Sequence, residues 1–172
     1  MKTETKEYFV IVDENDKVIG KEERSIAFQK RLIFRGLRII VKNEKGEYLF
    51  LKRTKEKKMF PDCWEIGVGG GLTYGEEPID AAKREVSEEL GIKNPQLTYI
   101  NKRYIENEKE RLFTYIFLTG HTRRDGQFVL QESEVADTAF VSKENLDEFL
   151  KDKKVHYPSV DMFKEMLKEG TI

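Results

Sequence analysis

The residues best suited to chemistry lie between positions 69 and 92, in the segment GGGLTYGEEPIDAAKREVSEELGI. Glu85, Glu88 and Glu89 are three and four positions apart, so on a helix their side chains would share one patch. Carboxylates held this close repel one another, which favours raised pKa values or a bound cation. Oxygen ligands select hard ions such as Mg²⁺, Mn²⁺ or Ca²⁺. The preceding glycines, 69–71, would let the backbone approach such an ion or a phosphate.

The element that must present these carboxylates is a helix from Pro78 to Leu90. Proline suits the first turn of a helix, and Gly91 suits the position just after its end. Apolar residues recur at helical spacing and form a stripe for the core: Ile79, Ala82, Val86 and Leu90. Taken alone, the glutamate cluster also fits an ordinary solvated helix face, and the glycine run also fits a turn.

Strands and helices around this segment predict an α/β (α+β) fold. A β-hairpin is expected around Asp13–Asp16, a second one around Asn43–Gly46, and a third pair of strands around the polar turn Asn107–Glu110. The segment WEIGVGGG, 64–71, predicts one short strand, and amphipathic helices are expected at 143–152 and 160–170. The order of strands, helix, strands and helices indicates a mixed sheet with helices packed on it.

The overall composition limits the classes of protein. The chain has 172 residues, 38% of them hydrophobic and 37% charged, with a net charge of −1, which favours a single domain spanning 1–172 with a heavily charged surface. The charge balance argues against a nucleic acid polymer or a membrane surface as partner. A single cysteine fits a reducing compartment, and the chain shows neither a signal peptide nor a membrane-spanning run, so we expect a cytoplasmic protein.

The spacing of the glycines, the arginine and the glutamates in this segment resembles the Nudix box. In that motif Gly, five residues, Glu and seven residues precede Arg-Glu-apolar-any-Glu-Glu-any-Gly-apolar. Residues 70–92 match every specified position, at Gly70, Glu76, Arg84-Glu85-Val86, Glu88-Glu89 and Gly91-Ile92. The resemblance implies a Nudix fold, an αβα sandwich with a mixed β-sheet, flanking helices and here an N-terminal hairpin extension. It also implies a Mg²⁺- or Mn²⁺-dependent hydrolase that cleaves a phosphoanhydride bond in a nucleoside diphosphate linked to another group.

The resemblance also assigns roles to residues of the box. Glu85, Glu88 and Glu89 would ligate the metal together with the backbone carbonyl of Gly69. Arg84 and Glu76 would form an orienting salt bridge, while Gly70 and Gly91 would be structural.

The general base is left open by the resemblance. A box glutamate, Glu88 or Glu89, could accept the proton of the attacking water. Relatives often use a loop glutamate about six residues before an aromatic residue of the last strand. Glu134, six residues before Phe140, fits that place, and Glu132 is its rival.

Beyond the box, residues 8–92 resemble the Nudix subgroup related to isopentenyl-diphosphate isomerase. This resemblance implies that Arg53 and Lys57 bind the diphosphate. The isomerase itself uses a catalytic cysteine and metal-binding histidines. Gly69 stands where that cysteine is expected and Cys63 lies six residues earlier, while Phe34 and Gly71 stand where histidines are expected. The two histidines, His121 and His156, lie far downstream, so hydrolysis is favoured over isomerisation.

Other classes stay open as alternatives. They are a Nudix module that binds diphosphates without cleaving them, which typically loses box acids, and RNA decapping, which the near-neutral charge disfavours. The aromatic residues that could stack on a base or pack a prenyl chain are Tyr74, Phe60, Trp64 and Tyr104, although aromatic residues usually belong to the core. A homodimer is possible through the N-terminal hairpin or the helix SVDMFKEMLKEG, which could instead belong to the core.

Overall fold

The computed structural model describes residues 6–121 and 127–172. Strands precede the central helix, and further strands and then helices follow it, as the sequence predicts. The strands and helices are β1 Tyr8–Val12, β2 Val18–Glu23, α1 Arg24–Gln29, β3 Ile33–Asn43, β4 Tyr48–Arg53, β5 Trp64–Ile66, β6 Val68–Gly71, α2 Pro78–Leu90, β7 Leu97–Glu106, β8 Arg111–His121, β9 Val135–Val141, the 3₁₀ turn Lys143–Asn145, α3 Leu146–Leu150 and α4 Tyr157–Glu169.

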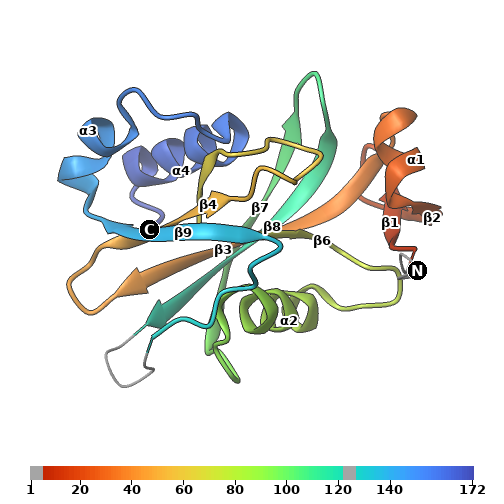
Figure 1. Ribbon diagram of the computed structural model, residues 1–172. Helices are drawn as coiled ribbons and strands as arrows, with labels where there is room; N and C mark the ends of the chain where they lie inside the picture. Colours follow the sequence, from red (N-terminus) through yellow and green to blue (C-terminus); the bar gives the residue numbers. More distant parts are fainter. Residues whose placement is uncertain (1–5, 122–126) are drawn as a thin grey trace.

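Strand β3 is the centre of a mixed sheet (Figure 1). It runs parallel to β8 along its whole length, from the pair Ile33 and Arg111 to the pair Asn43 and His121. It pairs antiparallel with β6 and touches β1 and β4 at single positions. Strand β7 continues the sheet beyond β8, whereas β4 pairs with β5 and β9 on the other side.

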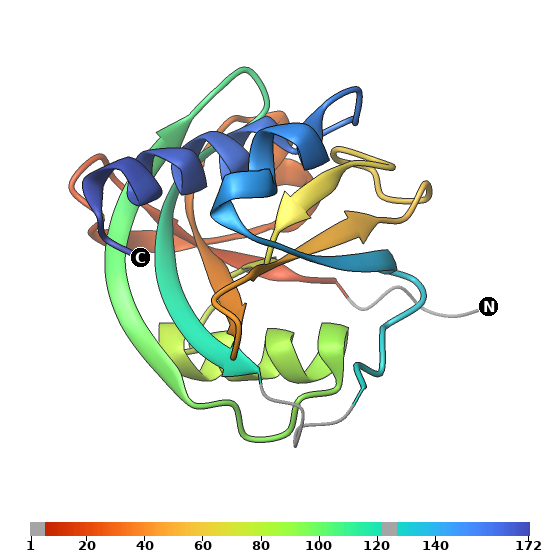
Figure 2. The same ribbon diagram turned by 90° about the vertical axis from the view of Figure 1, so that its left-hand side faces the viewer.

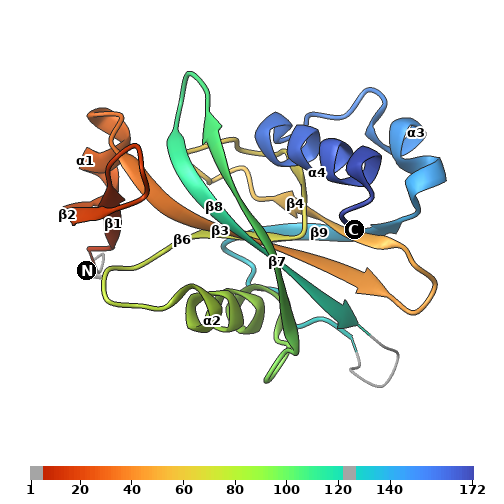
Figure 3. The same cartoon turned by 180° about the vertical axis from the view of Figure 1, so that it is seen from behind.

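The sheet lies between two layers of helices. Helix α2 covers one face, and α3 and α4 cover the other (Figures 1 and 3). The end view in Figure 2 shows the curved strands β7 and β8 passing between α2 and α4. Successive residues of β3 serve the two cores, because side chains alternate across a strand. Ile39 belongs to the core under α2 and Ile40 to the core under α4, and neither is exposed.

The structure confirms the predicted αβα arrangement and the bounds of the central helix. Helix α2 runs from Pro78 to Leu90, and Gly91 follows with φ of 71° in the left-handed conformation. Ala82, Val86 and Leu90 are buried in the core, as their spacing predicts.

The N-terminal hairpin is also present, and its turn is anchored to the sheet. Asp16 at the turn has φ of 61° and accepts hydrogen bonds from Arg35 Nε at 2.7 Å and Tyr115 Oη at 2.9 Å. Lys102 forms an ion pair with the same carboxylate. The hairpin is therefore fixed to the sheet rather than attached by its strands alone.

Three segments differ from the sequence prediction. The single strand expected over 64–71 is two strands, β5 and β6, because Gly67 turns the chain with φ of 57°. A Cβ at Gly67 would lie 2.0 Å from the Ile39 carbonyl oxygen, so glycine is required there. The helix expected over 143–152 is a 3₁₀ turn followed by the short α3. Helix α4 begins at Tyr157, before the expected 160, because His156 caps its first turn.

The helix SVDMFKEMLKEG belongs to the core rather than to an exposed interface. Val160, Met162, Phe163 and Met166 of α4 all lie in the core between that helix and the sheet. On the N-terminal hairpin, Val18 and Ile19 are exposed on β2. Among the described residues, no helix combines the length and apolar character needed to cross a membrane.

Candidate active site

A single arginine, Arg84, contacts three of the box carboxylates, which are Glu76 just before α2 and Glu85 and Glu88 on that helix. Arg84 makes a two-pronged ion pair with Glu76, through Nε to Oε1 at 2.9 Å and Nη2 to Oε2 at 3.1 Å. Its remaining nitrogen, Nη1, contacts Glu85 at 2.9 Å and Glu88 at 3.2 Å. The arginine thus orients the helix face and balances part of the charge that Glu85 and Glu88 place there.

Exposure differs sharply among the three box carboxylates. The Glu88 side chain is 50% exposed and that of Glu85 only 12%, while Glu89 is buried. Burial is the main cause that raises the pKa of Glu89 to about 8, and the carboxylates of Glu65 and Glu85 add to it. Burial likewise raises the pKa of Glu85, against the pull of Arg84. A buried carboxyl with a raised pKa gains stability from a nearby cation.

The glycine run allows three close approaches of side chains to β6. A Cβ at Gly70 would lie 2.5 Å from the carboxyl carbon of Glu85. A Cβ at Gly69 would lie 2.6 Å from the Arg38 guanidinium, and one at Gly71 would lie 2.1 Å from the Phe9 ring. The glycines of β6 therefore let the carboxylate of α2 reach the backbone of the strand.

These groups line one hollow, which we call the acidic hollow. It is lined by Glu85, Glu88, Glu89 and Glu134 together with Gln131, Arg24 and 69–71. The loop that carries Glu134 is fixed against α2, because Gln131 N donates to the Glu89 carbonyl oxygen at 3.2 Å. Its other side is fixed to the β4–β5 loop by Thr54 N, which donates to the Glu134 carbonyl oxygen at 3.1 Å.

Glu134 forms an ion pair with Lys57 from the β4–β5 loop. Burial lowers the pKa of Lys57, and the neighbouring charges of Arg53 and Arg24 lower it further. Glu132, the rival of Glu134 in the sequence, is exposed and does not line the hollow.

Arg53 lies in an environment that the sequence did not predict. Its Nη1 forms an ion pair with Glu65 at 2.7 Å, while Nε and Nη2 donate to the carbonyl oxygens of Phe60 at 3.0 Å and Met59 at 2.9 Å. Arg38 binds the second oxygen of Glu65, also at 2.7 Å. Fully buried between two guanidinium groups, Glu65 has its pKa lowered to about 2 despite the opposing effect of burial.

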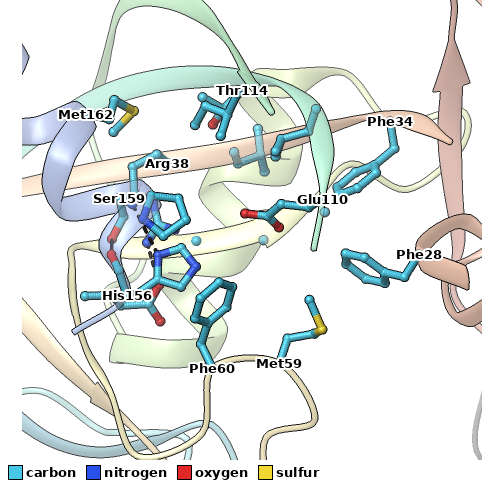
Figure 4. Close-up of a pocket in the computed structure, with 18 of the residues that line it drawn as sticks. Phe28, Phe34, Arg38, Met59, Phe60, Glu110, Thr114, His156, Ser159 and Met162 are labelled. Carbon is cyan, nitrogen blue, oxygen red and sulfur yellow. Dashed lines mark hydrogen bonds and ion pairs between the residues drawn. The ribbon is translucent and has the colours of Figure 1, made fainter. Parts of the chain in front are cut away.

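A second hollow, which we call the aromatic cavity, adjoins the acidic hollow, and the two share Arg24 and residues 69–71 as walls. Figure 4 shows the aromatic cavity. Among its lining residues are Phe28, Phe34, Phe60, Met59, Met162, His156 and Glu110. Of the aromatic residues singled out in the sequence, Phe60 lines this cavity. Trp64 packs on Phe149 in the core, and Tyr74 and Tyr104 are exposed elsewhere.

Comparisons with known proteins agree with the box and the fold. The NUDIX domain profile matches residues 33–163. An uncharacterised Nudix hydrolase of Pseudomonas aeruginosa is 32% identical over 133 residues, which are 77% of this chain and 77% of that protein. The chain belongs to the Nudix hydrolase family.

Solved structures of the Nudix hydrolase fold superpose on this chain at low sequence identity. The DR0079 crystal structure from Deinococcus radiodurans has a TM-score of 0.73 at 19% identity, covering 87% of this chain and 92% of that one. The NUDIX domain of Shewanella oneidensis NrtR, complexed with ADP ribose, has a TM-score of 0.61 at 11% identity, covering 78% of this chain and 86% of that one. Family membership makes this chain a hydrolase of pyrophosphate bonds.

Oxygen donors in the acidic hollow of this Nudix hydrolase suit a hard cation. Among the described residues, no three acidic, histidine or cysteine side chains converge closely enough to hold an ion as they stand. The contacts of Arg84 explain this, because they draw Glu85 and Glu88 toward the guanidinium. A cation would therefore compete with Arg84 for these two carboxylates, while the buried Glu89 has no ion pair with any described residue.

No cysteine or histidine is among the described residues that line the acidic hollow. Cys63 is buried, its thiol donates to the Pro61 carbonyl oxygen at 3.4 Å, and burial raises its pKa. His156 lies in the aromatic cavity and caps α4, where its Nδ1 accepts from Ser159 N at 3.3 Å. His121 stacks on Phe128 and Phe140.

Two features of the site escape sequence analysis. Arg38 and Glu65 are 27 residues apart and meet only because β3 and β5 lie in one sheet. Glu110 is the last residue of the turn Asn107–Glu110, and its sequence context is that of an ordinary turn acid. The one local signal was the placement of charged residues within otherwise apolar strands, at Arg38 and Glu65.

Proposed function

We propose that this Nudix hydrolase uses Mg²⁺ or Mn²⁺ to cleave a phosphoanhydride bond in a nucleoside diphosphate linked to another group. The observation that carries the proposal is the acidic hollow, where the buried Glu89, with its raised pKa, lies beside Glu85, Glu88 and the glycines of β6. Burial of several carboxylates in one hollow is unfavourable unless the hollow takes up a cation.

The proposed ligands are Glu85, Glu88, Glu89 and the backbone carbonyl of Gly69. A divalent cation held there would offset the negative charge of the substrate phosphates and would lower the pKa of a bound water.

The chain's own residues would divide the remaining tasks. Glu134 is the candidate proton acceptor, because it lines the hollow and reaches it from a different element than the box acids. Lys57, beside it, would bind a phosphate oxygen by a charge-assisted contact. Arg84 would orient the α2 carboxylates through its ion pairs.

The contacts of Arg53 support a different role from the one that the family resemblance implies. Its side chain contacts Glu65 and the carbonyl oxygens of Met59 and Phe60, so each guanidinium nitrogen makes one contact within the protein. We propose that it holds the β4–β5 loop, and with it Lys57, at the edge of the hollow.

The test is a phosphate-release screen. Purified protein would be incubated with Mg²⁺ or Mn²⁺ and with nucleoside di- and triphosphates, nucleotide sugars, dinucleoside polyphosphates, ADP-ribose and isopentenyl diphosphate, each with an EDTA control. Cleavage of one nucleotide class that needs the metal would support the proposal. We expect Glu88→Gln and Glu89→Gln to lower turnover by orders of magnitude with the fold intact. Metal-independent cleavage, or full activity in both variants, would contradict it.

A further inference from the structure

The aromatic cavity is placed to receive the part of a substrate that is not phosphate. It shares Arg24 and residues 69–71 with the acidic hollow, so one molecule could occupy both. A substrate with its phosphates at the box acids would reach the cavity by passing these glycines. This step rests on the proposed function, which places the phosphates in the acidic hollow.

The walls of the cavity are rich in flat rings. Phe34 and Phe28 pack edge to face, with ring centroids 5.2 Å apart, and Phe60 and His156 do the same at 4.3 Å. Figure 4 shows the first pair on one side of the cavity and the second pair on the other. Aromatic rings bind planar apolar groups by burial and by offset stacking.

One acid is directed into the space between these two pairs of rings. Figure 4 shows the Glu110 carboxylate pointing toward the middle of the cavity. Burial raises its pKa, and the charge of Arg38 and a side-chain hydrogen bond with Asn107 oppose that effect only in part. Among the residues that the structure describes, none forms an ion pair with Glu110.

The other charged groups of the cavity are already paired. Both oxygens of Glu65 are bound, one by Arg38 and one by Arg53. Arg24 pairs with Glu7 at 2.8 Å. Glu110 is therefore the polar group best placed to recognise a ligand. A carboxyl in such surroundings is stabilised by a partner that donates hydrogen bonds.

We infer that the aromatic cavity binds the organic group of the substrate and that Glu110 selects a planar group carrying N–H donors. A nucleobase with an exocyclic amino group has this chemistry, because its ring stacks and its amino group donates. Uncharged alkyl chains offer no donor, so they would give the half-buried Glu110 no hydrogen bond from the ligand.

The test measures nucleoside binding by NMR of the methionine methyl groups. Met59 and Met162 line the cavity, whereas Met166 is fully buried in the core under α4 and serves as an internal reference. Adenosine and purine riboside form one pair of probes and guanosine and inosine another, since the second member of each pair lacks the amino group. The methyl signals are assigned with Met59→Leu and Met162→Leu.

We expect adenosine and guanosine to shift the Met59 and Met162 signals while that of Met166 stays in place. Glu110→Leu should weaken adenosine binding at least tenfold and leave purine riboside binding unchanged, because only adenosine loses a hydrogen-bond partner. Glu110→Gln keeps an acceptor oxygen, so it should weaken adenosine binding less than Glu110→Leu does. The matched control is Glu108→Gln, at an exposed acid of the same turn, which should bind as the wild type does.

Equal binding of adenosine and purine riboside, unchanged adenosine binding in Glu110→Leu, or no methyl shift with any probe would overturn the inference. Nucleosides contain no phosphoanhydride, so this result does not depend on hydrolysis. A protein that binds adenosine through Glu110 but releases no phosphate would contradict the proposed function alone. One that releases phosphate but fails the methyl test would contradict the inference alone.

Discussion

Lys57 and Glu134, 77 residues apart in the sequence, form an ion pair at the edge of the acidic hollow. Sequence analysis had singled out each for a separate task, Lys57 for binding phosphate and Glu134 for accepting a proton. Their pairing means that a substrate phosphate would compete with Glu134 for the same ammonium group. We expect phosphate binding to free the carboxylate for the attacking water.

The first prediction follows from that pair. Lys57→Met should lower kcat/KM by about tenfold or more, mainly through a higher KM, because a charge-assisted contact to phosphate contributes about 1.5–3 kcal/mol. Steady-state kinetics on the best substrate of the screen would measure it. Lys58→Met, at an exposed lysine of the same loop, is the control and should behave as the wild type. An unchanged KM in Lys57→Met would remove Lys57 from the binding site.

A second prediction concerns Gly70. Gly70→Ala places a Cβ 2.5 Å from the carboxyl carbon of Glu85, so the flexible glutamate must move away. Turnover should fall at least tenfold, because displacing the Glu85 carboxylate disturbs the geometry of the site. The Tm should change by only a few degrees. Gly20→Ala is the control, since no atom lies within 4 Å of its added Cβ. Equal turnover in Gly70→Ala and wild type would show that the position of Glu85 does not matter.

A third prediction is a loss of stability in mild acid caused by His156. Burial lowers its pKa to about 3, from 6.5 in the unfolded chain, so between these values the unfolded state binds a proton that the folded state does not. Stability therefore falls as the pH drops through this window, by about 2 kcal/mol at pH 5 relative to pH 8 from this group. Urea denaturation at the two pH values would measure it.

A matched variant isolates the contribution of His156. His156→Asn keeps a capping side chain that does not titrate, so it should lose less stability than the wild type between pH 8 and pH 5. A loss in His156→Asn as large as that of the wild type would assign the acid sensitivity to other groups.

Local signals in the sequence were enough for α2 and for the hairpins. Pro78 marks the start of the helix and Gly91 marks its end, because each residue affects the backbone conformation only within a residue or two of itself. Glu65 shows what local signals miss. Its partners Arg38 and Arg53 reach it from two other strands, and strand register is set by the whole sheet.

Family resemblance places residues by position but does not specify their contacts. It paired Arg84 with Glu76, and the structure has that ion pair. It assigned Arg53 to the substrate, which stays a prediction, and it did not specify the contacts of the guanidinium with Glu65 and two carbonyl groups. Glu110 carried no signal at all, since a turn acid becomes notable only when the fold surrounds it with aromatic rings.

The central claim is that the acids of α2 bind a divalent cation, and the most direct test is a Mn²⁺ titration of the purified protein. Wild type, Glu89→Gln and Glu77→Gln would be compared by calorimetry, with Glu77 as an exposed acid just before α2. We predict that Glu89→Gln weakens Mn²⁺ binding at least tenfold, because it removes a charged ligand, and that Glu77→Gln binds as the wild type does. Equal affinity in Glu89→Gln and wild type would contradict the account.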